Sequence, residues 1–286
     1  MKVQGVEAAE QRDLGATGNR PTLDGVPYLQ LAAVNKSFAS TTGDALEAIA
    51  NVDLEVCEGQ FVAVVGPSGC GKSTLLQIAA GLLTPTAGRV LLNGRPVLRP
   101  PTEMVYLFQQ YSKSLLPWRS VVGNVAFAME RRSDLSKRQI SERAMSHLER
   151  VDLVRFADSY PSQLSGGMQQ RVAIARALAA EPRMLLLDEP FSSVDALTRL
   201  ELHDLLLEIA AKQGLTALLV THDVDEAVYL ADRVALLTAR PSSVSEVVTV
   251  DLPRPRDAIK TRERERFLEL RHHLLAQLLG PKHAAA

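Results

Sequence analysis

Residues 61–83 constrain the fold of this 286-residue chain more than any other segment. They begin with FVAVV, a continuous apolar run rich in β-branched residues, which is typical of a strand buried on both faces of a parallel sheet. A glycine-rich loop follows directly, and apolar residues then recur at helical spacing from Thr74 to Leu83. Strand, glycine loop and helix in this order predict an α/β fold with a binding loop at the carboxyl end of the strand.

The loop, GPSGCGKST, matches the pattern G-x-x-x-x-G-K-[ST]. In this pattern the glycines let backbone N–H groups wrap phosphate oxygens, the lysine reaches the β and γ phosphates, and the hydroxyl after it binds Mg²⁺. We therefore assign Lys72 to the phosphates and Ser73 to the metal. The residues expected to contact the nucleotide are Gly66, Pro67, Ser68, Gly69, Cys70, Gly71, Lys72, Ser73 and Thr74.

Residues 164–171, LSGGMQQR, predict a second anion-binding helix start. Ser165, Gly166 and Gly167 open the run Met168–Ala180, which has the character of a helix. Free backbone N–H groups and the positive end of the helix dipole face outward at such a start. This segment contains no lysine, and a single nucleotide does not need both sites.

Polar side chains follow three other apolar runs. Asp188 and Glu189 end the run LLLDE, where one carboxylate can hold Mg²⁺ and the other can polarise an attacking water; the alternative is a strand end with two solvated acids. Gln109 is either a ligand of water or metal, or a polar residue leaving a strand. His222 either senses a γ-phosphate or is a partly exposed polar residue.

Three further residues carry weaker signals. Phe38 precedes a polar stretch and either stacks on a purine or packs in the core. Asp195 is well placed to cap the helix that follows it, a role that needs no ligand. Trp118, the only tryptophan, is either a core anchor or a contact for another protein.

Composition and charge narrow the class of protein. With 32 Lys and Arg against 33 Asp and Glu, the chain lacks the broad basic footprint of a nucleic-acid-binding protein. Two cysteines, Cys57 and Cys70, favour a reduced cytosolic setting. No run reaches the ~18 apolar residues of a membrane span, and the N-terminus lacks the apolar core of a signal peptide. Any membrane role must therefore depend on a partner.

The remaining pattern divides the chain into parts. Residues 1–27 are expected to form a disordered tail. Amphipathic helices over 121–132 and 136–151, with more helix to Tyr160, predict a helical insert over about 112–165. Strands are expected at 89–92, 104–108, 184–187, 217–220 and 234–237, with a helix over 196–212 that ends at Gly214. A last helix over 257–279 is expected to bury Leu268, Leu270, Leu274, Leu275 and Leu278.

Taken together, the motifs resemble those of the ATP-binding-cassette (ABC) ATPases. The likeness runs from about Leu29 to Leu237 and rests on GPSGCGKST, Gln109, LSGGMQQ, LLLDEP, Ser192–Asp195 and His222, in that order. It implies a P-loop NTPase (RecA-like) α/β core with a mainly parallel sheet, an N-terminal antiparallel β subdomain and an inserted α-helical subdomain. It places the ABC ATPase domain at residues 28–250 and leaves 251–286 as a C-terminal helical extension.

The resemblance implies that the chain hydrolyses ATP with Mg²⁺. By position, Glu189 matches the catalytic base of the family and His222 its switch histidine. The implied catalytic group is Glu189, His222, Lys72 and Gln109, and the implied metal-binding group is Ser73, Gln109 and Asp188. Phe38 matches the aromatic residue that stacks on adenine.

The second helix start also gains an explanation. In the resembled family two subunits bind head to tail as a homodimer and sandwich two ATP molecules, so that the signature of one subunit meets the phosphate loop of the other. Residues that match this signature are Ser165, Gly166, Gly167 and Gln169. Asp195 matches the loop that makes contacts across the dimer.

A narrower likeness covers residues 109–118, 221–234, 238–241 and 251–255, which are similar to the import ATPases of the nitrate, sulfonate and taurine group. It implies a subunit on the cytoplasmic face of a bacterial inner membrane that serves a membrane permease and, indirectly, an external solute-binding protein. The segment after Gln109 resembles the surface that receives the coupling helix of the permease, which gives Trp118 a partner-facing role.

Two other functions are open on the sequence. A soluble ABC ATPase that acts on nucleic acid or ribosomes usually has two cassettes or a long coiled coil, together with a basic surface. None of these is visible, so we expect no nucleic-acid partner. A small-molecule kinase with the same phosphate loop leaves the motif LSGGMQQ unexplained.

Overall fold

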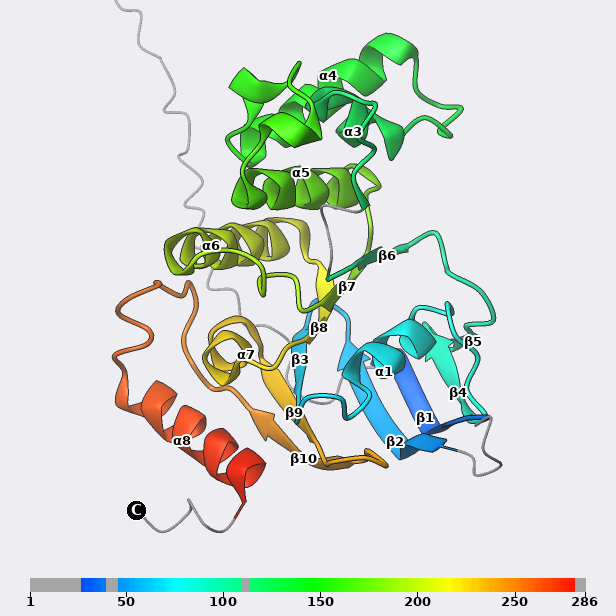
Figure 1. The fold of residues 1–286 in the computed structure, drawn as a ribbon, viewed down its shortest axis with the longest axis vertical. Helices are drawn as coiled ribbons and strands as arrows, with labels where there is room; N and C mark the ends of the chain where they lie inside the picture. The colour runs from blue at the N-terminus through cyan, green and yellow to red at the C-terminus, as the bar shows by residue number, and fades with distance from the viewer. Residues whose placement is uncertain (1–26, 40–45, 110–113, 281–286) are drawn as a thin grey trace, which may run out of the picture.

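The computed structural model describes residues 27–39, 46–109 and 114–280. The expected tail over residues 1–27 lies, apart from Pro27, outside the described residues. Two sheets and a group of helices make up the fold (Figure 1). The strands are β1 Pro27–Phe38, β2 Leu46–Cys57, β3 Phe61–Val65, β4 Ala87–Leu92, β5 Arg95–Pro96, β6 Met104–Leu107, β7 Met184–Asp188, β8 Thr216–Val220, β9 Arg233–Leu237 and β10 Val244–Thr249.

The larger sheet has the strand order β10-β9-β3-β8-β7-β6 and is parallel except for β10. Strand β3 lies inside it between β9 and β8, and all five residues of β3 are buried. Phe61, Ala63 and Val65 face one core cluster, whereas Val62 and Val64 face the other. The continuous apolar run therefore reflects a strand covered on both faces, as its sequence predicts.

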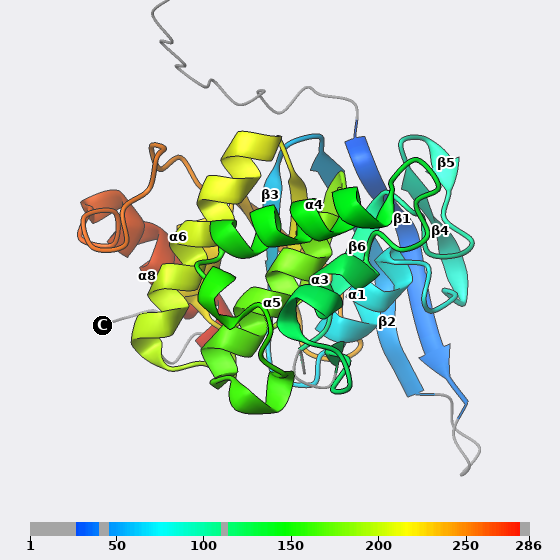
Figure 2. The same cartoon turned by 90° about the horizontal axis from the view of Figure 1, so that it is seen from above.

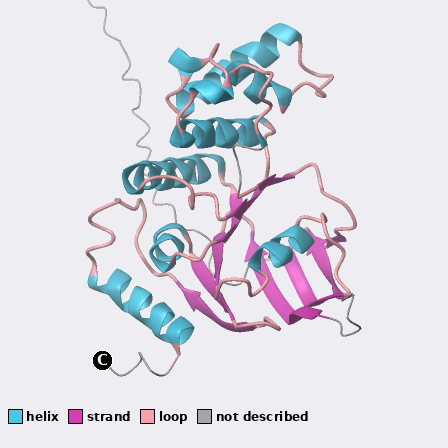
Figure 3. Cartoon of the chain, in the orientation of Figure 1, coloured by secondary structure: helices cyan, strands magenta, loops and turns pink. Residues whose placement is uncertain are grey.

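The smaller sheet is antiparallel, with the order β2-β1-β4-β5. One core cluster joins its apolar residues to helix α1 (Lys72–Ala79) and to the adjoining face of the larger sheet. Figure 3 shows the strands gathered in one part of the molecule and most helices in another. The mainly parallel core, the antiparallel sheet near the N-terminus and the inserted helices confirm the expected fold class.

The inserted helices form a layer over the larger sheet, which Figure 2 shows from above. They are α3 Val121–Phe127, α4 Lys137–Arg150 and α5 Gly166–Ala179, followed by α6 Ala196–Gln213 and α7 Val224–Leu230. Ser136 caps α4 with a capping box, in which its hydroxyl accepts from the Gln139 N–H. Gly214 ends α6 in the left-handed conformation, with φ of 62°, as expected from the sequence.

Two predicted helices are shorter than expected. The helix over 121–132 ends at Phe127, because the N–H groups of Ala128, Met129 and Glu130 bond to carbonyls three residues back instead of four. The prediction of more helix to Tyr160 is wrong. Asp152 adopts a φ of 57°, which interrupts the helical backbone after α4, and only the 3₁₀ turns Val154–Phe156 and Pro161–Gln163 follow.

The terminal helix α8 spans Glu265–Leu279, so its predicted start at Asp257 is wrong. The Asp257 carboxylate accepts from the N–H groups of Ile259 and Lys260, which stabilises a turn before the helix. The later start also changes the buried stripe: Phe267, Leu270 and Leu274 are buried. Two members of the predicted stripe are exposed, Leu268 by 41% and Leu275 by 37%.

Candidate functional site

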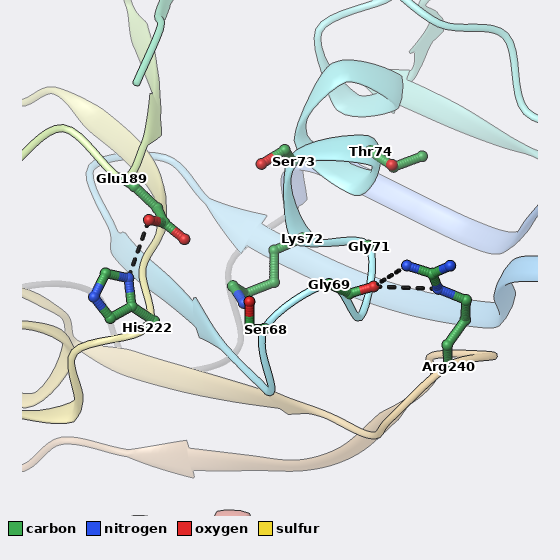
Figure 4. Close-up of a pocket in the computed structure, with 9 residues that line it drawn as sticks. All are labelled: Ser68, Gly69, Gly71, Lys72, Ser73, Thr74, Glu189, His222 and Arg240. Atoms are coloured by element: carbon green, nitrogen blue, oxygen red, sulfur yellow. Dashed lines mark hydrogen bonds and ion pairs between the residues drawn. The ribbon is translucent and has the colours of Figure 1, made fainter. Parts of the chain in front are cut away.

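The carboxyl ends of four parallel strands gather the predicted polar residues. Strands β3, β8, β7 and β6 end next to one another and are followed by the phosphate loop, His222, Glu189 and Gln109 respectively. A pocket of about 520 Å³ opens there. Its lining residues include Lys72, Ser73, Thr74, Glu189 and His222, and Figure 4 shows these side chains around a common space. The edge of a parallel sheet is where α/β proteins bind ligands.

Lys72 is held in place by its own loop. Its ammonium group donates to the carbonyls of Gly66 at 2.9 Å and Pro67 at 3.0 Å, and the residue is 5% exposed. Gly69 and Gly71 have φ values of 73° and 110°, which residues other than glycine rarely adopt. The loop therefore has a conformation that places a buried cation at the start of α1.

The loop is also packed tightly from behind. A Cβ atom on Gly66 would lie 3.0 Å from Cys70 Sγ and from Leu237 Cβ, so a larger residue does not fit. Burial raises the pKa of the Cys70 thiol, which disfavours the reactive thiolate. Cys70 thus acts as a small apolar filler in the loop.

Ser73, which lines the pocket, and Asp188 behind it place oxygen atoms side by side. The Ser73 hydroxyl donates to Asp188 Oδ1 at 2.8 Å, and the Tyr106 hydroxyl donates to Asp188 Oδ2 at 2.7 Å. Burial and this hydrogen bond to the carboxylate raise the pKa of Tyr106, so the phenol keeps its proton. Tyr106 was missed by the sequence analysis, because it has no local signal and gains its contact only through the pairing of β6 with β7.

Glu189 receives hydrogen bonds from two predicted partners. His222 Nδ1 and Gln109 Nε2 lie 3.0 and 3.1 Å from the same carboxylate oxygen, Glu189 Oε2. Glu189 has a φ of 42°, a left-handed conformation that is uncommon outside glycine and frequent at functional sites. Its N–H donates to Val220 O at 2.8 Å, which fixes the residue to β8. The structure thus brings Gln109, Glu189 and His222 together.

The oxygen donors suit a hard cation such as Mg²⁺. This ion keeps several waters and binds through one or two protein oxygens together with phosphate oxygens. Ser73 Oγ and Asp188 Oδ1, 2.8 Å apart, offer such a partial set. In the described ranges no group of three or more His, Cys, Asp and Glu residues could hold a metal by itself. The Ser73–Asp188 pair fits an ion whose other ligands are phosphate oxygens and water.

The second helix start lies apart from this pocket. Of the described residues that line the pocket, none belongs to the segment 164–171. Ser165 is the N-cap of α5, and its hydroxyl accepts from the Met168 N–H at 3.3 Å. Ser165 and Gly166 are exposed, whereas a Cβ on Gly167 would lie 2.5 Å from Thr198 Cγ2. Within one chain, the structure therefore does not unite the two predicted anion sites.

The sequence matches a protein-family model. The model described as ABC transporter covers residues 49–192, which contain the phosphate loop, Gln109, the segment 164–171 and Glu189. The chain belongs to the ABC transporter family. It carries the ATP-binding domain of that family, and its activity is ATP hydrolysis coupled to transport.

Three relatives illustrate the range of this family. An uncharacterized ABC transporter ATP-binding protein of Methanocaldococcus jannaschii is 51% identical over 82% of this chain and 85% of that protein. The nitrate transport protein NasD of Klebsiella oxytoca is 42% identical over 88% of this chain and 95% of that protein. The bicarbonate transport ATP-binding protein CmpC of Synechococcus elongatus is 43% identical over 87% of this chain, which spans only 37% of that longer protein.

A solved ATP-binding cassette has a similar fold. It is a dimer in a post-hydrolysis state, bound to ADP and Pi. Its TM-score is 0.69 at 32% identity, and the similarity covers 78% of this chain and 98% of that one. This structure supports ATP binding by the ABC domain described here.

The remaining predicted contacts of the ABC domain lie outside the pocket lining. Phe38 is 39% exposed at the end of β1, with Lys36 Nζ 5.1 Å from its ring centroid, so it is not a core residue. Asp195 caps α6 by accepting from the Thr198 N–H at 3.0 Å. Trp118 is 72% exposed, which rules out the core-anchor alternative.

Two glutamines that follow the Ser-Gly-Gly motif have different environments. The side-chain nitrogen of Gln169 donates to the carbonyls of Pro161 at 2.9 Å and Leu164 at 3.3 Å. Gln170, which the sequence analysis did not select, is fully buried and donates to the carbonyl of Pro190. Helix α5 is therefore fastened directly to the residue after Glu189.

Arg240 is a second residue that the sequence analysis missed. It follows β9, lines the pocket, and donates from Nε and Nη2 to the carbonyl of Gly69 (Figure 4). The pocket thus contains two cationic side chains, Lys72 and Arg240. Arg240 lies in the segment 238–241 that resembles the import ATPases, but the sequence assigned it no role, and only the fold brings it to the phosphate loop.

Proposed function

We propose that this chain is the nucleotide-binding subunit of a bacterial ABC importer that energises the uptake of a small anionic solute. The observation that carries this proposal is the pocket in which Lys72, Ser73, Glu189 and His222 meet. The nitrate transport relative, which this chain matches over 95% of its length, supports an import system.

Each side of the pocket has a proposed task. Lys72 and the loop N–H groups bind the phosphates of ATP, while Ser73 and Asp188 hold Mg²⁺ with Gln109 nearby. When bound, Mg²⁺ neutralises charge on the β and γ phosphates. Tyr106 occupies the second oxygen of Asp188 and leaves the first oxygen facing Ser73.

Glu189 is the proposed general base. Its carboxylate accepts a proton from a water molecule as the water oxygen bonds to the γ-phosphorus. The bond from that phosphorus to the bridging oxygen then breaks, and ADP leaves with the electron pair. The contacts of His222 Nδ1 and Gln109 Nε2 with Glu189 Oε2 support this assignment, because they fix the direction of the carboxylate.

The segment 164–171 is proposed to act on the nucleotide of a second copy of the chain. Ser165 and Gly166 are exposed and lie outside the pocket lining, so they are free to meet another molecule. The solved cassette with ADP and Pi is a dimer, which supports such an assembly. We infer a head-to-tail homodimer in which Phe38 stacks on adenine and Asp195 contacts the partner.

Substitution of the proposed base tests the mechanism. The variant Glu189→Gln is expected to bind ATP normally and to hydrolyse it about 1000-fold more slowly, since general-base catalysis commonly contributes 10²- to 10⁴-fold. Gel filtration with ATP should show the variant as a dimer. Glu149→Gln, on the exposed face of α4, is the control. Full turnover by Glu189→Gln would show that another group is the base.

An apolar groove is the proposed contact for the permease. It has a volume of about 470 Å³ between β6, α3 and α5, and its lining residues include Phe108, Leu116, Phe127 and Ala177. Phe108 and Phe127 are exposed, as is Trp118 nearby in the chain. Exposed aromatic residues of this kind are typical of protein interfaces. None of the helices in the described ranges is long and apolar enough to cross a membrane.

A pull-down from detergent-solubilised membranes tests this partner. We expect the wild-type chain to recover a permease that spans the membrane several times, and Trp118→Ala together with Phe127→Ala to recover much less of it. Recovery of ribosomes or DNA would instead support the alternative function. We propose that the subunit binds this permease on the cytoplasmic face of the inner membrane.

The solute class rests on relatives alone. Nitrate and bicarbonate, named for NasD and CmpC, are small anions, and the sequence resemblance extends to sulfonates and taurine. We propose that an external solute-binding protein supplies such an anion to the permease. A deletion strain that loses growth on nitrate, or on a sulfonate as the sulfur source, would identify the solute. A strain with unchanged use of all these anions would contradict the anionic class.

A further inference from the structure

A buried polar cluster lies directly behind His222. It consists of Thr221, Glu226 and His203, which are 1%, 5% and 2% exposed. None of these side chains lines the nucleotide pocket, and the proposed chemistry uses none of them. Polar groups are costly to bury unless contacts with their neighbours compensate them, so the cluster calls for a role.

One end of the cluster fixes the backbone around His222. The Thr221 N–H donates to Val64 O at 3.1 Å, and its hydroxyl donates to Glu226 Oε2 at 2.9 Å. The same hydroxyl accepts from the Asp223 N–H at 3.0 Å. Both neighbours of His222 are therefore tied to Glu226 through a single hydroxyl group.

The other end of the cluster reaches the C-terminal segment. Arg262 Nη2 lies 3.3 Å from His203 Nδ1, Arg262 Nη1 donates to Ala258 O at 2.7 Å, and the guanidinium stacks 3.8 Å from the Tyr229 ring centroid. A guanidinium only donates, so Nδ1 of His203 accepts and Nε2 carries the proton. That Nε2 faces Glu226 Oε1 at 3.9 Å. Arg262 thus fixes the tautomer that faces Glu226.

His203 also touches the loop after Glu189. The Phe191 ring meets the His203 ring edge-on, with centroids 4.6 Å apart and an interplanar angle of 85°. Phe191 is fully buried and lies two residues after Glu189. One imidazole therefore packs on Phe191, two residues after Glu189, and lies 3.9 Å from Glu226, whose other carboxyl oxygen accepts from the Thr221 hydroxyl beside His222. The side chains of Glu189 and His222 themselves meet at 3.0 Å in the pocket.

We propose that Arg262 is a positioning residue for ATP hydrolysis: through His203 and Glu226 it sets the place of His222 against Glu189. The proposal rests on the function proposed above for His222 and Glu189. Arg262 belongs to the segment between β10 and α8, outside the residues that the family model matches. The C-terminal segment therefore supports ATP hydrolysis in addition to packing against α7.

The test compares turnover with nucleotide affinity. Arg262→Met keeps the aliphatic stem of the side chain but removes the guanidinium, and with it the donor to His203 and the stack on Tyr229. We expect kcat to fall about tenfold while KM for ATP changes less than twofold, because a misplaced catalytic group slows chemistry without weakening binding. Arg262→Lys restores one donor and should recover part of the rate. Arg264→Met, exposed in the same segment, is the control.

A double substitution separates positioning from general loss of structure. In a His222→Ala background, Arg262→Met should cause no further fall in the single-turnover rate, because the group that it positions is gone. An equal fall in both backgrounds, an unchanged kcat, or a change confined to KM and Tm would overturn the proposal. If His222→Ala itself hydrolyses ATP at the wild-type rate, the function proposed for His222 fails first, and this inference fails with it.

Glu226 supplies an independent readout. The pKa of Glu226 is raised to about 8; burial is the largest cause, Asp223 and Glu189 act in the same direction, and Thr221 and Arg199 oppose them. Burial lowers the pKa of the neighbouring His203, which stays neutral. Glu226→Gln imitates the protonated carboxyl and should keep the rate within about twofold at pH 7, whereas Glu226→Leu should lose about tenfold. The wild-type rate should fall from pH 7 to 9 as Glu226 ionises, and the Gln variant should not follow it. Identical pH profiles would overturn the proposal.

Discussion

Helices α1 and α5 both begin with backbone N–H groups that are not bonded within the helix, but the residues around the two helix starts differ. Helix α1 begins behind Gly71 with no side-chain cap, and its first residue, Lys72, is buried on the carbonyls of its own loop. Helix α5 begins behind Ser165, whose hydroxyl caps the Met168 N–H, and its first residue is exposed. Both starts have the backbone arrangement that favours an anion, but the first lines the pocket with Glu189 and His222, whereas the second lies outside that pocket.

The difference between the two helix starts indicates that they have different functions. The phosphate loop has glycines with positive φ, a fixed lysine and a serine that is hydrogen-bonded to Asp188, the pair proposed to hold Mg²⁺. This equipment suits nucleotide binding within one chain. The start of α5 has only a neutral cap and free N–H groups, which are too weak to hold an anion in water alone. We therefore expect the first site to determine nucleotide affinity and the second to determine turnover in a dimer.

Removing the cation of the phosphate loop should have the largest effect. Lys72→Ala is expected to weaken ATP binding roughly 10- to 100-fold, the value of a charged hydrogen bond, and to reduce hydrolysis by about 1000-fold. Equilibrium dialysis and a phosphate-release assay measure the two quantities. Lys137→Ala, exposed at the start of α4, is the control. Normal ATP affinity in Lys72→Ala would break the comparison, because the phosphate loop would then not determine binding.

The second helix start should separate binding from turnover. Ser165→Arg places a bulky cation at the N-terminus of α5, and we expect ATP binding by the monomer within twofold of wild type and hydrolysis at least about 100-fold lower. Analytical ultracentrifugation with ATP should show loss of the dimer. Ser146→Arg, exposed on α4, controls for the added charge. Wild-type hydrolysis by Ser165→Arg would mean that this helix start takes no part in the reaction.

Much of this comparison could be predicted from the sequence. The run FVAVV gives the exact bounds of β3, because burial on both faces leaves no polar residue to blur the pattern. Helix α5 begins at Gly166, two residues before its predicted start, since a serine that caps and the glycines after it are helix-start signals in themselves. Glu189 and His222 were found because parallel strands bring their carboxyl ends to one edge.

The site residues that could not be predicted from the sequence owe their positions to contacts between segments that are distant in the chain. Arg240 meets Gly69 only because β9 lies beside β3, and Tyr106 meets Asp188 only because β6 lies beside β7. The predicted helix to Tyr160 failed for a local reason: Asp152 in the left-handed conformation ends the helix without glycine or proline to announce it. Single-residue patterns carry neither kind of information.

Substitution of Arg240 should have a smaller effect on ATP binding than substitution of Lys72. Its guanidinium is exposed and lines the pocket next to Gly69. Arg240→Ala is expected to weaken ATP binding about threefold to fivefold, because an exposed cation is partly screened by water. The loss should shrink in 0.5 M salt if charge is the cause. Arg95→Ala, at an exposed arginine on β5, is the control. If both substitutions had an equal effect, Arg240 would make no specific contribution to ATP binding.

The smallest expected effect distinguishes the two roles of the hydroxyl at the start of α5. Ser165→Ala leaves the Met168 N–H without its cap and should lower the free energy of unfolding by about 1 kcal/mol. Ser165→Asp retains a capping oxygen and should keep that stability, but its charge repels phosphate. Urea unfolding should therefore rank Ser and Asp above Ala, while ATP hydrolysis should rank Ser first, Ala second and Asp last. If both measurements gave the same order, Ser165 would act only as a helix cap, and the contrast with the phosphate loop would concern stability rather than function.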